Sequence, residues 1–392
     1  MDNGQTAASD PATVEAGTDT ATTAAAPSRM AEGIYFGLDE DTYHADMALG
    51  SGSIRALAKC PAYYWAASWM NPLREAAAET PALLYGRALH CLVLEGPDAF
   101  RSRYAVTPRP ADYPGALVTA DDIKNVLRKL PKEDLKAWGV KLSAAKPELL
   151  GWIREIDPGA IIFDDVLAAF REECSTKKIS ALDARTYGEI VQAAEYITGD
   201  PRVAAAFRGG RPEVSLFWEQ DGVPMKARLD YVRLGKENGQ PVALVTDLKS
   251  FANVMDAPPE RAVINAISRT RLDVQAAAYF EGIKRIPEMV VAGKVYGTDG
   301  INTDWLTVFG SIPVENWRFY WCFYEKGFPV SMLRSTRYNS ALLAAARMEM
   351  ERALQAYRDN MEAFGTNWRF VDPVPDIEVM LDDLPKWLQA TT

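Results

Sequence analysis

Three short runs rich in β-branched and aromatic residues lie close together in the middle of the chain, and they constrain its fold more than any other feature. Polar turn residues, including Gln220-Asp221-Gly222, separate the runs. Runs of this length and composition, with such turns between them, predict three consecutive antiparallel strands. The runs occupy residues 213–219, 226–232 and 243–249, and the second turn occupies 235–239.

Charged residues lie near the ends of two of these predicted strands. Asp230 interrupts the apolar run of the second strand, and Asp247 and Lys249 flank Leu248 at the close of the third. Side chains two apart point to the same face of a strand, so Asp247 and Lys249 share a face and Leu248 points away. If the second and third strands pair, Asp230 lies beside Asp247, and the two carboxylates repel each other unless a divalent cation sits between them.

A pair of carboxylates with a lysine at its edge suits the hydrolysis of a phosphodiester. Hard oxygen ligands hold Mg²⁺, the metal acidifies a water molecule, and the ammonium group orients that water or offsets charge. The alternative is structural, with two strand-end aspartates that make turn contacts and one solvated lysine. The motif is too short to decide between the two by itself.

The composition excludes several classes of protein. A chain of 392 residues with 48% hydrophobic residues has room for one large domain or two ordinary ones. No apolar run is long enough to span a membrane and no secretory signal is recognisable, so we expect a cytoplasmic protein with no membrane partner. The 4 cysteines lack Cys-x-x-Cys spacing, which favours reduced core residues over a disulfide, zinc or iron–sulfur site. The net charge of −10 argues against a protein that coats nucleic acid nonspecifically, but not against an enzyme that holds DNA in a local basic channel.

The N-terminal part begins with a polar stretch. Residues 1–31 carry almost no large apolar side chains and are predicted to be disordered. A serine-capped helix is expected to begin within 50–57 and to stop near Cys60. An aromatic cluster follows, which either packs as a helical stripe or forms an arch of rings that stacks on unpaired bases. Its members are Tyr63, Tyr64, Trp65 and Trp69.

Histidine is scarce, with 2 in the chain, so each is informative. His90 lies in a predicted helix, residues 83–94, on the same face as Gly86 one turn earlier. A glycine there lets another backbone, a metal or a phosphate approach closely. His90 is therefore either a half-buried structural histidine or a metal ligand.

Residues 113–157 differ from the rest of the chain in charge and pattern. Thr119 and Asp122 form a capping box before one helix, and Ser143 is expected to cap a second. Basic residues outnumber acidic ones over positions 121–146. The segment resembles a SAP-like helix-extension-helix module, a small nucleic-acid-binding unit, and the alternative is a solvated helical insertion. The basic residues are Lys124, Arg128, Lys129, Lys132, Lys136, Lys141 and Lys146.

Further helices and strands are expected on both sides of the central runs. A helix from about Arg269 places Gln275 and Tyr279 on one face. The small residues between them leave room for a phosphate or a catalytic lysine to approach. We also expect helices over 185–207 and 338–364, and strands near 289–296 and 317–324.

Taken in order, these residues resemble the PD-(D/E)XK nuclease superfamily in its RecB-like branch, and more closely the phage and prophage exodeoxyribonuclease VIII (RecE) type. The likeness covers about residues 33–330. It departs from the superfamily pattern because no proline precedes Asp230, and because Asp247 stands as the acid of the E-x-K pair; both leave the metal preference open. The superfamily motifs are His90, Asp230, Asp247-Leu248-Lys249 and Gln275-x-x-x-Tyr279. The RecE-type motifs are Tyr43-His44, Ser51-x-Ser53, Pro61-Ala62-Tyr63, Gly86-x-x-x-His90 and Arg228-x-Asp230-Tyr231.

The resemblance implies a metal site and a catalytic lysine. Asp230 and Asp247 would bind Mg²⁺ or Mn²⁺, helped by the Leu248 carbonyl. His90 would contribute to a second metal position. Lys249 would position or activate the attacking water.

Other residues would support this centre or bind substrate. Gln275 would orient the lysine or a phosphate, and Tyr279 would support that arrangement. Glu213 is either a further metal ligand or a structural residue. Lys226 and Arg228 lie on the same strand face as Asp230. They either hold the scissile phosphate or pair with nearby acids.

The resemblance also implies a fold and an activity. The fold would be α/β, with a central mixed sheet flanked by helices and an inserted helical module. The activity would be that of a metal-dependent exonuclease that digests linear double-stranded DNA, 5′ to 3′, and leaves a 3′ strand for a single-strand annealing protein in phage-type recombination. Such enzymes are typically homo-oligomeric rings. The predicted parts are 32–112, 113–157, a nuclease core over 158–335, and a C-terminal helix and tail over 336–392.

Two alternatives remain open. One is a RecB-like nuclease of other polarity or substrate, such as a Cas-type end-trimming enzyme. The other is a non-catalytic DNA-binding module that keeps the same fold.

Overall fold

A computed structural model describes residues 29–75, 79–253, 255–366, 368–371, 378–384 and 386. Most of the predicted disordered tail, residues 1–28, lies outside the described residues. Within them, no helix has the length and apolar character needed to cross a membrane. The cysteines are free thiols, as predicted, and Cys91, Cys174 and Cys322 are buried.

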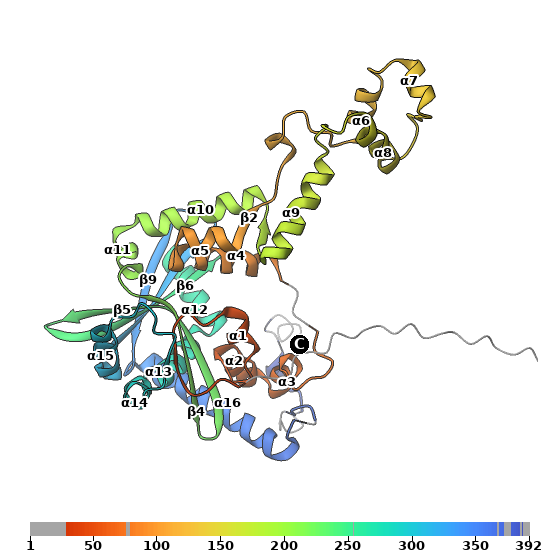
Figure 1. The fold of residues 1–392 in the computed structure, drawn as a ribbon. Helices are drawn as coiled ribbons and strands as arrows, with labels where there is room; N and C mark the ends of the chain where they lie inside the picture. Colours follow the sequence, from red (N-terminus) through yellow and green to blue (C-terminus); the bar gives the residue numbers. More distant parts are fainter. Residues whose placement is uncertain are drawn as a thin grey trace, which may run out of the picture.

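A mixed sheet of seven strands, with helices on both faces, forms the body of the described chain (Figure 1). The three predicted strands are confirmed as β4, β5 and β6, which pair antiparallel in sequence order. Parallel pairing of β6 with β8 and of β1 with β7 makes the sheet mixed. In the order β7-β1-β4-β5-β6-β8-β9, the strands are Val295–Tyr296, Gly33–Tyr35, Arg211–Gln220, Val223–Glu237, Gln240–Phe251, Trp317–Glu325 and Ser331–Arg337.

Tight turns fix the register of the three central strands. The β4–β5 turn has Asp221 and Gly222 at φ 49° and 77°, and the β5–β6 turn has Asn238 and Gly239 at φ 50° and 78°. Two successive residues with positive φ make turns whose twist matches that of the flanking strands, and Asp-Gly and Asn-Gly tolerate this conformation best. The sequence of the turns therefore sets which residues lie opposite each other in the sheet.

Helices cover both faces of the sheet and divide the core into two main clusters. One cluster packs α2, α13 and α16 against the sheet and includes Phe280, Phe319 and Trp321. The other packs α4, α5 and α10 against the opposite face and includes Leu248 and Cys322. The helices on the first face and its edge are α2 Ser51–Lys59, α3 Pro61–Ala67, α12 Pro259–Thr270, α13 Leu272–Ile283, α14 Ile286–Val291, α15 Thr303–Ser311 and α16 Ala341–Phe364. The others in the body are α1 Glu40–Ala45, α4 Pro81–His90 with a π-helical turn Cys91–Glu95, α5 Pro97–Arg103, α10 Ala184–Gly199 and α11 Pro201–Ala204.

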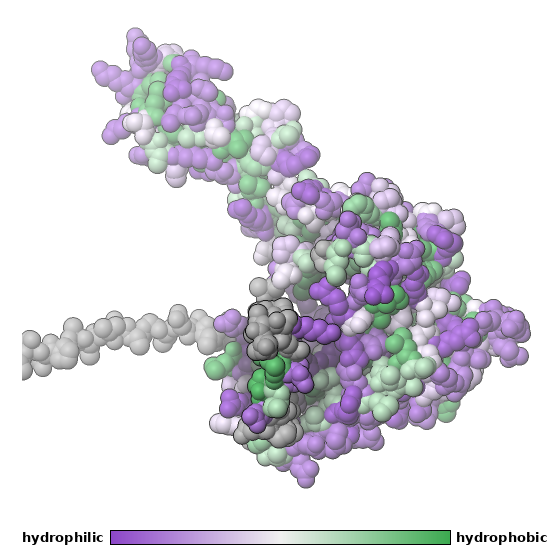
Figure 2. Space-filling model, turned by 180° about the vertical axis from the view of Figure 1, so that it is seen from behind, coloured by the Kyte–Doolittle hydropathy of each residue, from purple (hydrophilic) through white to green (hydrophobic). Residues whose placement is uncertain are grey.

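The basic insertion forms a separate helical unit that projects from the body (Figure 1). The chain leaves and re-enters the body through a short parallel pair of strands, β2 Tyr104–Val106 and β3 Ser180–Leu182. The view from behind shows hydrophilic side chains over most of its visible surface (Figure 2). Its helices are α6 Ala120–Leu127, α7 Lys132–Ala137 and α8 Lys146–Ile156, and α9 Phe163–Lys177 links them to the body. Its own core contains Leu117, Ile123, Leu127, Leu149, Leu150, Ile153 and Ile162.

Several predicted element boundaries are confirmed. The capping box of Thr119 and Asp122 is present at the start of α6. The helices expected over 185–207 and 338–364 are present, as is the strand near 317–324. Tyr64 is buried and its ring packs against Tyr357 and Phe370, which favours helical packing over an arch of base-stacking rings.

Other local predictions are wrong. The strand expected over 289–296 is extended only at Val295–Tyr296, because a proline starts helix α14 before it, and that helix continues to Val291. The helix expected from about Arg269 is two helices, which break at Arg271 with φ 51°. Ser143 caps no helix, since α8 begins after Ala145. The cap of α2 is Gly50, without a side-chain hydrogen bond.

Candidate active site

The candidate site lies where β5 and β6 separate. Their ladder ends at the pair Tyr231↔Thr246, although β6 continues beside β8 to Phe251. Beyond that point Leu248 has no partner on β5, and side chains take the place of the missing strand contacts. Asp230 Oδ2 accepts a hydrogen bond from the Leu248 N–H at 2.9 Å, and His90 Nε2 lies 2.9 Å from the Leu248 carbonyl oxygen. The opening in the sheet is thus filled by residues of the predicted motif.

Asp247 and Lys249 lie together on one face of β6, as predicted. Lys249 Nζ is 2.7 Å from Asp247 Oδ2. Asp247 is fully buried, whereas the Lys249 side chain keeps 26% of its surface exposed. Leu248 points to the opposite face and packs in the other core cluster. The ammonium group is therefore fixed beside the acid and still reachable from solvent.

Gln275 and Tyr279 share a face of α13 and extend this constellation. Gln275 Nε2 donates hydrogen bonds to Asp247 Oδ1 at 3.0 Å and to Tyr279 Oη at 3.1 Å. Both amide hydrogens are used by these two bonds. The structure thus places Gln275 against Asp247 rather than against Lys249, where the resemblance placed it.

His90, at the end of α4, contacts both Asp230 on β5 and the Leu248 carbonyl on β6. Its Nδ1 lies 3.6 Å from Asp230 Oδ2, and its Nε2 faces the Leu248 carbonyl. Burial, and then the charge of Lys249, lower the pKa of His90 to about 4, so the ring is neutral. A neutral ring that donates Nε2–H to the carbonyl directs the Nδ1 lone pair at the Asp230 carboxylate. Two acceptors that face each other are favourable only with a cation or a proton between them.

The acids are in an environment that opposes their ionisation. Burial raises the pKa of Asp247 to about 6, although Lys249 pulls in the opposite direction. Burial also raises the pKa of Asp230. For Lys249 burial acts to lower the pKa, but Asp247 and Asp230 outweigh it and the pKa is raised. The lysine is therefore a cation at neutral pH, and the acids gain from a further positive charge.

Glu213 lies opposite Asp230 on the neighbouring strand β4. The pairs on either side are Pro212↔Tyr231 and Val214↔Leu229, so the two carboxylates are cross-strand neighbours. Glu213 has φ 53°, a conformation that few non-glycine residues adopt, at the cavity wall. Burial, and then Asp230, raise the pKa of Glu213 to about 8.

This shift predicts a pH-dependent stability. The folded protein binds the Glu213 proton more tightly than the unfolded chain does, so in EDTA its contribution to stability is lost as pH rises from about 4.5 to about 8. We expect Glu213→Gln to melt above the wild type at about pH 8, by about 2 °C or more, and to match it near pH 5. Calorimetry across this range checks the result, with the exposed Glu219→Gln on the same strand as control. A constant difference at all pH values would contradict the assignment.

Lys226 and Arg228 lie on β5 beside Asp230 and hold the segment that contains α1. Lys226 Nζ donates to the carbonyl oxygens of Tyr43 at 2.7 Å and of Asp46 at 2.8 Å. Arg228 Nη2 donates to the Leu38 carbonyl oxygen at 2.7 Å, and Nε donates to Ser215 Oγ at 3.0 Å. Lys226 thus binds backbone carbonyl groups rather than nearby acids. Arg228 binds a carbonyl and a hydroxyl group, and its Nε also lies 3.7 Å from Glu213 Oε2. Their substrate-binding role remains a prediction.

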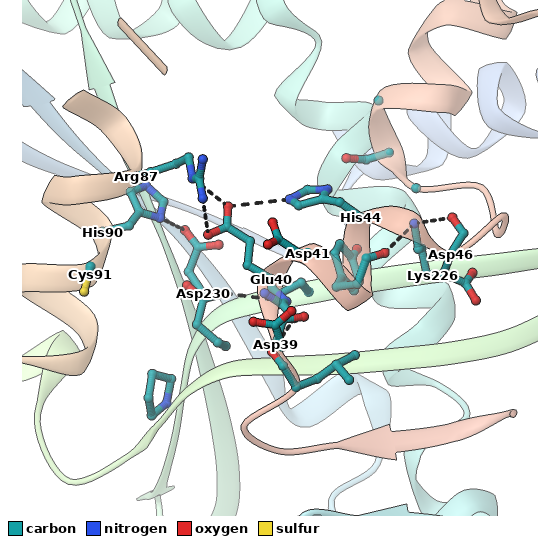
Figure 3. A pocket seen from close by; sticks show the side chains of 18 of the residues that line it. Asp39, Glu40, Asp41, His44, Asp46, Arg87, His90, Cys91, Lys226 and Asp230 are labelled. Atoms are coloured by element: carbon teal, nitrogen blue, oxygen red, sulfur yellow. Dashed lines mark hydrogen bonds and ion pairs between the residues drawn. The ribbon is translucent and has the colours of Figure 1, made fainter. Parts of the chain in front are cut away.

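A cavity of about 1310 Å³ opens beside this centre. Its wall includes His90, Glu213 and Asp230, whereas Asp247 and Lys249 do not line it. Gly86 is on the same wall, and a Cβ there would meet no described atom within 4 Å, so the glycine widens the cavity instead of allowing another backbone to approach. The close view shows the acidic residues Glu40 and Asp41 of α1 between His90 and Lys226 (Figure 3).

Sequence reasoning missed two residues of this cavity. Glu40, at the start of α1, and Arg87, one turn before His90 on α4, form an ion pair with Nε and Oε1 3.0 Å apart. The spacing of Arg87 and His90 on one helix was a usable signal. The position of Glu40 was not, because it depends on how α1 folds back over the sheet.

The donor set fits a divalent cation held largely by water and substrate. Within the described part of the chain, no group of three or more His, Cys, Asp or Glu side chains is arranged to hold a metal. Asp230 and Asp247 supply two carboxylates, and Asp247 Oδ2 is buried without a properly aligned hydrogen bond. Mg²⁺ is commonly bound through one or two carboxylates together with waters and substrate phosphates.

Comparison with known protein families gives no match for this chain, and comparison with curated proteins gives none either. The function is therefore inferred from the residues and their geometry.

Proposed function

We propose that this protein is a divalent-metal-dependent nuclease that hydrolyses phosphodiester bonds of linear double-stranded DNA. The observation that carries the proposal is the convergence of Asp230, Asp247 and Lys249 at the opening between β5 and β6, with His90 beside them. Buried acids of raised pKa next to a charged lysine are typical of catalytic sites, and one of these acids, Asp230, lines the cavity. A purely structural ion pair does not need the second acid or the histidine.

Some residues of the site would bind the metal, and others would position the reacting groups. Asp230, Asp247 and the Leu248 carbonyl would hold Mg²⁺ or Mn²⁺, which when bound would acidify a water molecule and offset phosphate charge. Lys249 is an ammonium ion and donates a hydrogen bond to the attacking water or to a phosphate oxygen. Gln275 keeps Asp247 in one orientation through its 3.0 Å hydrogen bond. Its second bond, to Tyr279, fixes the amide in turn.

The resemblance to RecE-type enzymes supports an exonuclease that digests 5′ to 3′ and leaves a 3′ strand for an annealing protein, as part of phage-type recombination. The cavity supports a macromolecular substrate, since its volume of about 1310 Å³ exceeds that of most small-ligand pockets. A homo-oligomeric ring and a cytoplasmic location belong to the same proposal.

The test is an assay on linear duplex DNA labelled at either end. We expect nucleotide release in Mg²⁺, none in EDTA, and release of the 5′ label before the 3′ label. Release of the 3′ label first would favour the RecB-like alternative of other polarity. Binding without release under every metal condition would show that the chain is a DNA-binding module and not an enzyme.

The projecting helical unit would add affinity for the DNA backbone. In the described structure no acidic partner is recorded for four exposed lysines, Lys129, Lys132, Lys136 and Lys141. Changing all four to glutamine should weaken DNA binding and reduce the slope of log K against log salt by about one for each lysine that contacts a phosphate.

Binding measured between low and moderate salt checks this prediction. A matched control changes four surface cations that already pair with acids, Lys177, Arg185, Arg202 and Lys294, to glutamine. Equal effects of the two sets would mean that the helical unit does not contact DNA and that only the overall charge matters.

A further inference from the structure

Arg87 lies on the wall of the cavity, next to the reacting groups. It is on α4, one helical turn before His90, so the two side chains share a helix face. Both residues line the cavity. The close view shows the Arg87 guanidinium group and the Glu40 carboxylate side by side, near His90 and Asp230 (Figure 3).

Glu40 reaches Arg87 because α1 is fixed across the cavity. Lys226 and Arg228, on β5, hold backbone carbonyl groups on either side of this short helix. Glu40 is in the first turn of α1 and also lies 3.7 Å from His44 Nε2. An acidic side chain is thus presented to a cavity whose wall also carries Asp230, where its negative charge is unfavourable unless a cation balances it.

The pairing leaves Arg87 incompletely satisfied. Its Nη1 donates to Glu79 at 2.8 Å and its Nη2 to Glu40 at 3.2 Å. Its Nε lies 3.0 Å from Glu40 Oε1, but it is buried and makes no hydrogen bond to any group in the described structure. The Nε–H group is therefore paired with Glu40 by charge without an aligned hydrogen bond, and an acceptor aligned with it would bind this edge of the guanidinium group better.

Arg103, on the same wall, forms a bidentate pair with one carboxylate and serves as a comparison for Arg87. Its Nη1 and Nη2 donate to the two carboxylate oxygens of Glu95 at 2.5 and 2.6 Å. Both arginines line the cavity, but Arg103 makes two parallel hydrogen bonds to one carboxylate, whereas Arg87 makes one to Glu79 and one to Glu40. A phosphate can accept two parallel hydrogen bonds from a guanidinium edge, as a well-placed carboxylate does.

We propose that Arg87 binds a backbone phosphate of the DNA strand beside the reacting centre, and that Glu40 is a positioning residue that holds the guanidinium group until the phosphate replaces it. The inference depends on the proposed nuclease function and adds a substrate contact to it. It assigns to Arg87 the role that the sequence suggested for Lys226 and Arg228, whose side chains are used to hold α1.

The experiment measures binding of labelled linear duplex in Mg²⁺ at several salt concentrations, in a Lys249→Ala background in which cleavage is expected to be slow. Arg87→Ala should weaken binding by about tenfold or more and reduce the salt slope by about one. Arg87→Lys keeps the charge but loses the guanidinium edge, so it should restore the slope and recover part of the affinity. Arg103→Ala should change affinity less than about threefold, because its partner is internal.

Glu40→Gln removes the competing charge and keeps the shape, so it should bind DNA at least as tightly as the parent. Equal effects of Arg87→Ala and Arg103→Ala, or a loss in Glu40→Gln as large as that in Arg87→Ala, would overturn the inference, since Arg87 would then be only a structural bridge. If Arg87→Ala does not fold, Arg87→Lys and Glu40→Gln still decide. A wild-type protein that neither binds nor cuts DNA would refute the nuclease proposal itself.

Discussion

We expect Lys249→Ala to slow DNA hydrolysis by a factor of about 100 to 1,000. The ammonium group lies 2.7 Å from Asp247 Oδ2, and the pKa of Lys249 is raised, so the group is charged at the pH of the assay. It is the cation that the site itself supplies to the attacking water or the phosphate. Its loss removes an interaction that strengthens as charge develops in the transition state.

The measurement is single-turnover cleavage of linear duplex in Mg²⁺, which separates the chemical step from binding. Lys294→Ala is a suitable control, because this lysine forms an exposed ion pair with Glu32 on the far edge of the sheet. Circular dichroism establishes that both variants fold. If Lys249→Ala keeps more than about a tenth of the wild-type rate, the lysine is not a catalytic residue.

A second large effect is expected for Asp230→Asn, which should reduce activity by about a thousandfold or more while leaving the metal-free protein as stable as the wild type. Burial raises the pKa of Asp230, so its ionised form is unfavourable in the fold without a cation. An asparagine retains an oxygen that accepts the Leu248 N–H bond, and it removes the like charge that faces Glu213.

Thermal unfolding with and without Mg²⁺ checks this prediction. The wild type should melt at a higher temperature when Mg²⁺ is added, because a ligand that binds only the folded state stabilises it. The Asp230→Asn variant should show no such increase. A large drop in the melting temperature of the metal-free variant would mean that Asp230 is a structural residue at the end of its strand.

The parts of the site that the sequence predicted are those governed by local geometry. The shared face of Asp247 and Lys249 follows from the two-residue period of a strand. The contact of Gln275 with Tyr279 follows from the period of a helix. Each relationship spans at most four residues, so no knowledge of the tertiary structure was needed.

The parts that it missed depend on contacts between distant segments. The separation of β5 from β6, which makes room for the site, arises because β6 stays paired with β8, far away in sequence. The contact of His90 with the Leu248 carbonyl spans 158 residues. The same limit explains the misplaced strand at Val290, where an apolar run with β-branched residues is helical because it packs beside α15.

The pairing of Gln275 with Asp247 illustrates the limit within the site. Sequence spacing placed the amide on the correct helix face, but the partner on that side depends on how α13 packs on the sheet. Glu40 is a similar case, since contacts from the distant strand β5, including those of Lys226 and Arg228, hold α1 at the cavity.

Anomalous scattering of Mn²⁺ in crystals of the full chain would show directly whether the two acids bind a metal. We expect a peak bonded to a carboxylate oxygen of both Asp230 and Asp247, with Lys249 beside it. Crystals of Asp230→Asn should lack that peak. A peak at another cluster, or none at saturating Mn²⁺ while Asp247 and Lys249 keep their ion pair, would contradict the account.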